Sequence, residues 1–99
     1  MKKQRIENLI KEIATRIENI RFTIERYKEE IEEIEIFEFR FEQFEIDLLQ
    51  KLETGTFLKY GEYAKTLLQE RQNELKKWET ILTKLEIVKK LQIKSGGLN

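Results

Sequence analysis

The chain has 99 residues, of which 38% are charged, and its 19 basic and 19 acidic side chains give a formal net charge of zero. It contains no cysteine, histidine or proline, which excludes disulfide scaffolds, thiol catalysis, zinc fingers and histidine-based acid/base chemistry. A chain of this length forms one domain at most, and its isoleucine, leucine and charged residues are typical of long solvated helices. We therefore expect an all-α protein that is not an enzyme.

The first predicted element is a long helix over residues 4–53. Apolar residues recur along its first part in alternating steps of four and three, with charged residues between them. Such spacing, held for about four heptads, is a coiled-coil seam that requires a partner helix. The seam consists of Ile6, Ile10, Ile13, Ile17, Ile20, Ile24, Tyr27, Ile31 and Ile34.

A second apolar stripe follows the seam, after the spacing slips at Ile34. Its members are Phe37, Phe41, Phe44 and Leu48. A single seam uses one apolar face, so this stripe either widens the intramolecular core or stays exposed as a docking or self-association surface. Residues 34–42 also nearly alternate between apolar and polar, but the many glutamates and the lack of a second strand favour a helix.

A turn is expected at residues 54–56, followed by a second helix over residues 57–94. Gly55 can adopt the left-handed conformation that ends a helix, and Thr56 can cap the next one. An alternative position for the turn is Gly61. The second helix carries its own seam in steps of four and three, formed by Ala64, Leu68, Arg71, Leu75, Trp78, Leu82 and Leu85.

Charge is distributed unevenly along the chain. Residues 1–16 and 84–94 are basic, whereas residues 25–47 contain ten acidic and three basic side chains. If the chain folds back on itself, the acidic part of the first helix lies beside a net positive part of the second. Charge matching therefore favours one antiparallel two-helix coiled-coil hairpin over residues 1–99.

The residue types offer no catalytic, cofactor or metal site. The glutamates lack the histidines of a bundle-type di-metal site, and the glycines match no phosphate loop or dinucleotide fingerprint. Lysine and arginine are interspersed with glutamate and lack an aromatic platform, so nucleic-acid binding is not expected. No run approaches the roughly 20 apolar residues of a membrane span, and the start of the chain does not look like a secretory signal. We expect a cytoplasmic protein that is at most peripheral to a membrane.

The aromatics late in the first helix precede a characteristic run in the second, Phe57-x-x-Tyr60 and then Leu67-x-x-x-Arg71-x-x-x-Leu75-x-x-Trp78. This pattern resembles the FliJ family, a coiled-coil stalk component of the bacterial flagellar type III export apparatus. The resemblance is densest over residues 57–88. It implies an antiparallel two-helix coiled coil that engages the hexameric export ATPase, promotes assembly of that ring, contacts the export gate protein and escorts export chaperones.

The resemblance also implies which residues bind a partner. On the second helix they are Tyr60, Ala64, Leu67 and Arg71, and on the first helix the family's spacing fits Phe37, Phe41, Phe44 and Leu48. In an antiparallel hairpin these two stripes come together on the half nearest the turn.

Two other functions remain open. One is a self-associating structural or regulatory protein, in which a homodimer buries the stripe from Phe37 to Leu48 inside a four-helix bundle. The other is a helical regulator of nucleic-acid machinery, which salt-dependent binding to DNA or RNA would reveal.

Overall fold

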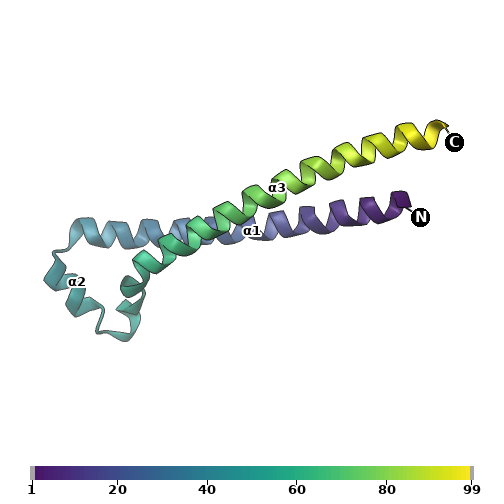
Figure 1. Ribbon diagram of the computed structural model, residues 1–99. Coiled ribbons are helices and arrows are strands. Elements are labelled where there is room, and N and C mark those ends of the chain that lie inside the picture. The colour runs from purple at the N-terminus through teal and green to yellow at the C-terminus, as the bar shows by residue number, and fades with distance from the viewer. Residues whose placement is uncertain (1, 99) are drawn as a thin grey trace. The chain divides into compact units, whose positions relative to one another are not determined.

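All regular structure in the described part of the chain is helical, which confirms the predicted all-α class (Figure 1). The computed structural model describes the backbone of residues 2–98 and the side chains of residues 4–92. The elements, in chain order, are α1 (Lys2–Arg40), α2 (Gln43–Leu49), the 3-10 helix η1 (Glu53–Tyr60) and α3 (Gly61–Leu98).

The chain divides into two compact units. Unit 1 contains residues 1–21 and 73–99, and unit 2 contains residues 22–72. Helices α1 and α3 contribute to both units, whereas α2 and η1 belong to unit 2 alone.

The predicted seams are the buried faces of the two long helices. Of the nine seam positions from Ile6 to Ile34, six are buried and three are half-buried. On α3, the seam from Ala64 to Leu85 is likewise buried or half-buried. Most residues between these positions are exposed, so each helix carries the narrow buried stripe that its heptad spacing predicts.

Two ion pairs join α1 to α3 in unit 1. Glu7 and Lys89 approach to 3.9 Å, and Arg21 and Glu79 approach to 3.2 Å. The residue numbers on α3 therefore fall as those on α1 rise, and Figure 1 shows the first turns of α1 and the last turns of α3 at the same end of this unit. Both pairs are partly exposed, so each stabilises the unit by only about 0–1 kcal/mol.

A cation–π contact shows how the predicted register differs from the actual one. The guanidinium carbon of Arg16 lies 5.2 Å from the ring centre of Trp78. A hairpin turning at Gly55 would instead have placed Arg16 beside Lys94. The register is shifted because the connection between the long helices, residues 41–60, is centred before Gly55.

The first helix ends earlier than the predicted range of residues 4–53. Helix α1 stops at Arg40, and Glu42 adopts an extended conformation with φ −76° and ψ 160°. The backbone N–H of Glu42 then donates a hydrogen bond to the carboxylate of Glu45 at 3.0 Å. This bond satisfies an amide at the start of α2 that would otherwise lack a partner.

A small hydrophobic core explains why the chain breaks here. Ile34 of α1, Ile46 of α2 and Leu58 of η1 are buried together. Fully burying one such aliphatic side chain contributes about 1.5–3 kcal/mol, and a helix continuing straight through residues 41–53 would leave Ile46 and Leu58 without this contact. The half-buried residues packed around this core are Phe37, Leu49 and Phe57.

The predicted role of Gly55 as a left-handed helix stop is wrong. Gly55 lies within η1, and no glycine among the described residues has a positive φ. A Cβ atom at this position would collide with the carbonyl oxygen of Leu49, so a glycine is required by the close approach of two backbone segments. Thr56 also differs from expectation, because its hydroxyl donates to the carbonyl of Glu53 at 2.6 Å.

The second long helix is displaced relative to the predicted range of residues 57–94. Residues 57–60 belong to η1, and α3 begins at Gly61, which has helical φ −54° and ψ −50°. Helix α3 continues to Leu98. No helix in the described part of the chain is both long and apolar enough to span a bilayer.

Candidate protein-binding surface

Aromatic side chains are concentrated in unit 2. All six phenylalanines and all three tyrosines lie between Phe22 and Tyr63, whereas Trp78 lies in unit 1. Nine of the fourteen large apolar side chains that are exposed among the described residues also belong to unit 2. Exposed apolar side chains gathered in one region mark an interaction surface in soluble proteins.

A groove opens on unit 2 between α1, η1 and α3. Its volume is about 800 Å³, which is within the range of natural binding sites. Its apolar and aromatic lining is made by Tyr27, Ile34, Phe57, Tyr60, Tyr63, Ala64 and Leu67. All three tyrosines of the chain therefore line one groove.

The polar part of this groove is acidic. Glu30 and Glu33 of α1 line it together with Thr54 and Thr56, and no lysine or arginine among the described residues does so. Neither glutamate forms an ion pair with a described residue. A ligand in this groove would contact aromatic side chains and two carboxylates that have no ion-pair partner among the described residues.

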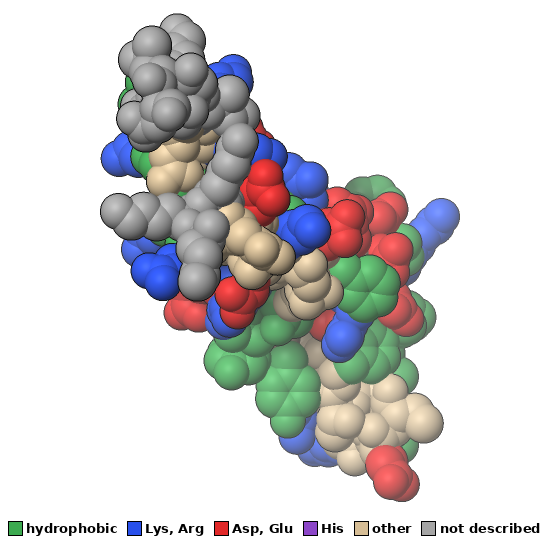
Figure 2. Space-filling model, turned by 90° about the vertical axis from the view of Figure 1, so that its right-hand side faces the viewer, with side chains coloured by type: hydrophobic (Ala, Val, Ile, Leu, Met, Phe, Trp, Pro, Cys, Tyr) green, Lys and Arg blue, Asp and Glu red, His purple; other side chains and the backbone are tan. Residues whose placement is uncertain are grey.

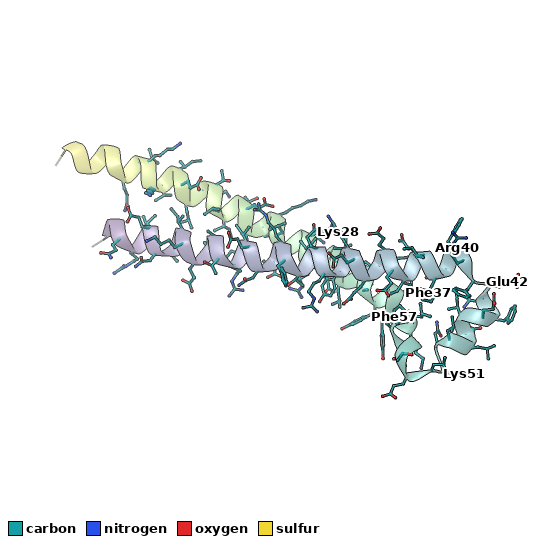
Figure 3. The ribbon with its side chains drawn as sticks, turned by 180° about the vertical axis from the view of Figure 1, so that it is seen from behind. Lys28, Phe37, Arg40, Glu42, Lys51 and Phe57 are labelled. Carbon is teal, nitrogen blue, oxygen red and sulfur yellow. The ribbon has the colours of Figure 1, made fainter. Side chains whose placement is uncertain are left out.

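The predicted stripe on the first helix is divided by the break after α1. The ring of Phe37 stacks on Phe41 with centroids 5.5 Å apart and meets Phe57 edge-on at 5.6 Å. Figure 3 shows Phe37 and Phe57 together on the side of α1 that faces η1. Phe44, which is 61% exposed, and Leu48 project instead from α2.

The eight predicted partner-binding residues thus fall into distinct environments. Tyr60, Ala64 and Leu67 line the groove. Phe37 is half-buried against the small core, whereas Phe41, Phe44 and Leu48 are exposed. Arg71 is half-buried on α3 outside the groove lining.

Periodicity alone missed several residues of this surface. The spacing predicts Tyr27 only as a seam residue and does not single out Tyr63, Glu30 or Glu33. The signal that identifies the two tyrosines is the confinement of every phenylalanine and tyrosine to residues 22–63, since a seam alone requires no such clustering of aromatics. No comparable signal distinguishes the two glutamates from the other acidic residues of this region.

A second, shallower hollow lies on the outer face of α1. It has a volume of about 370 Å³ and is lined by Glu32, Glu35, Ile36, Phe39 and Arg40. Phe39 is 86% exposed, so nearly its whole ring contacts solvent. Figure 2 shows hydrophobic side chains lying open on the surface beside acidic ones.

Comparisons with known proteins give no match: no family model, no curated protein and no solved structure is similar to this chain. Among the described residues, no group of three or more acidic side chains is arranged to hold a metal ion.

Proposed function

We propose that the chain is a non-enzymatic cytoplasmic adaptor that binds a protein partner through unit 2. The observation that carries this proposal is the concentration of exposed aromatic side chains in that unit, two of which, Tyr60 and Tyr63, line its groove. Tyrosine and phenylalanine supply large contact areas and lose little conformational entropy on binding, so they commonly anchor protein interfaces.

We further propose that the two long helices form an antiparallel coiled-coil hairpin. In unit 1, the pairs Glu7–Lys89 and Arg21–Glu79 support this arrangement. In unit 2, Ile34 of α1 lies against Gly61 at the start of α3. In such a hairpin, α2 and η1 form the connection between the two long helices.

A narrower form of the proposal follows from the resemblance to the FliJ family. The partner would then be the export gate protein, the hexameric export ATPase or an export chaperone. Three of the residues that this resemblance assigns to partner binding, Tyr60, Ala64 and Leu67, line the groove, and this supports the narrower form.

Self-association is the second candidate function, and the outer face of α1 favours it. Phe39 is almost fully exposed and lies beside a hollow that also includes Ile36. Two copies that packed these faces together would bury both side chains in a four-helix arrangement.

Site-specific photo-crosslinking in the producing cell tests the proposal. The photoreactive residue benzoylphenylalanine would replace Phe44 of α2 or, as a matched control, Ile87 of α3, which is 53% exposed in unit 1. We expect an adduct with another protein from Phe44 and none from Ile87. Mass spectrometry would identify that protein, and an export component would establish the narrower form.

Two results would contradict the adaptor proposal. An adduct of twice the mass of the chain would show self-association instead. Equal adducts from both positions, or none from either, would show that unit 2 has no special part in binding.

A further inference from the structure

We infer that the groove of unit 2 binds an arginine- or lysine-bearing segment of the partner protein. This inference deepens the proposed function and rests on it, since it assigns the chemistry of the segment that unit 2 receives. It is drawn from the composition of the groove, the charge of unit 2 and a contact made elsewhere in the same chain.

The groove combines the two features that recognise a basic side chain. Tyr27, Tyr60 and Tyr63 line the groove, and the face of a tyrosine ring attracts a cation. Glu30 and Glu33 add carboxylates that form no ion pair with described residues and can accept charge-assisted hydrogen bonds. A guanidinium satisfies both, because it stacks on a ring while its edge donates to a carboxylate.

The charge of unit 2 favours the same kind of ligand. Residues 22–72 contain thirteen acidic and seven basic side chains, whereas unit 1 contains six acidic and twelve basic ones. Unit 2 therefore carries a net charge of −6 within a chain that is neutral overall. A surface of one sign attracts segments of the opposite sign and accelerates their association.

The chain itself contains the proposed kind of contact. In unit 1, Arg16 lies over the ring of Trp78 at 5.2 Å. The groove of unit 2 is lined by the three tyrosines, but by no basic side chain among the described residues.

A second copy of the chain is a less suitable source of the basic segment. Its positive unit 1 would have to enter the groove of the first copy. Two of the basic side chains of that unit, Arg21 and Lys89, are already paired with glutamates of the same unit. We therefore assign the groove to a segment of a different protein.

Binding of a synthetic peptide to the purified chain tests this inference without the cellular partner. The probe is a short peptide rich in arginine and leucine, and its twin carries citrulline, an uncharged isostere, at every arginine. Fluorescence anisotropy measures the affinity, and amide NMR shifts locate the site. We expect shifts around Tyr27, Tyr60 and Tyr63, and a loss of about tenfold or more in affinity for the citrulline twin.

Two double variants that change the net charge equally distinguish binding by the groove carboxylates from attraction by the overall negative charge of unit 2. Glu30→Gln with Glu33→Gln removes both groove carboxylates, whereas Glu29→Gln with Glu35→Gln removes two exposed carboxylates of α1 outside the groove lining. We expect the first pair to weaken binding of the arginine peptide at least about fivefold more than the second pair.

Three outcomes would overturn the inference. Equal affinity for the arginine peptide and its citrulline twin would show that the groove recognises apolar side chains and not positive charge. Equal effects of the two double variants would show that the peptide responds only to the net charge of the chain. Shifts outside the groove would place the peptide elsewhere. Each of these can occur while Phe44 still crosslinks to a partner, so failure of this inference is distinguishable from failure of the adaptor proposal.

Discussion

Replacing Ile34 by alanine is expected to destabilise the protein by about 2–5 kcal/mol, the usual cost of truncating a buried isoleucine. Ile34 is 4% exposed and packs with Ile46 and Leu58, which come from two other elements. The truncation leaves a cavity in this core. Because the core is small, the lost side-chain atoms account for a large share of the contacts that hold α2 and η1 against α1. Urea denaturation followed by circular dichroism would measure the change in unfolding free energy.

The matched control for this variant is Ile17→Ala. Ile17 is also 4% exposed but belongs to unit 1. Amide hydrogen exchange should separate the two variants: Ile34→Ala should accelerate exchange in α2 and η1, whereas Ile17→Ala should leave these elements protected. A loss below about 1 kcal/mol for Ile34→Ala, far under the usual range, would show that Ile34 is not part of a packed core.

Gly55→Ala is expected to cost about 1–3 kcal/mol, as overpacking of a close contact generally does. The added methyl group would collide with the carbonyl oxygen of Leu49, which is backbone and cannot move aside as a side chain could. The turn between α2 and η1 must therefore shift to accommodate it. Thermal unfolding of the purified variant measures the effect.

Gly61→Ala makes the same substitution where the backbone is helical. Its Cβ atom would lie 3.2 Å from the Cγ2 atom of Ile34, so the Ile34 side chain must shift by a few tenths of an ångström. Alanine favours the helix by about 1 kcal/mol relative to glycine, which offsets the cost of this shift, so this variant should lose less stability than Gly55→Ala. Equal losses from the two substitutions would contradict the steric role of Gly55.

The seams could be predicted from the sequence because they rest on a local repeat. Steps of four and three between residues such as Ile13, Ile17 and Ile20 place these residues on one face of a helix, and this does not depend on the tertiary structure of the rest of the chain. Their burial in unit 1 and unit 2 follows this spacing.

The connection between the long helices could not be predicted in the same way. The apolar repeat continues through Phe41 and Phe44 among good helix formers, so the local signal favours an unbroken helix. We attribute the end of α1 to a long-range contact, the burial of Ile46 and Leu58 against Ile34. The spacing of apolar residues along the sequence does not indicate such a contact. Gly55 was misassigned for a related reason, because a glycine required by close backbone approach looks the same in sequence as one that ends a helix.

The composition of the groove was only partly predictable. The resemblance to the FliJ family predicts Tyr60, Ala64 and Leu67 as partner-binding residues. Tyr27 and Tyr63 join them only because the shifted register brings α1, η1 and α3 together around one groove.

The most direct test of the central claim, that unit 2 exposes its aromatic side chains for a partner, is to measure folding and partner binding in the variant Phe44→Glu. A charge at this exposed position of α2 should leave helicity and melting temperature as in wild type and should abolish the adduct formed by a photoreactive residue at Leu48. The comparison variant Phe37→Glu alters a half-buried ring that packs on the core and should unfold unit 2. If Phe44→Glu unfolds the protein as Phe37→Glu does, or folds and still forms the adduct, the claim is wrong.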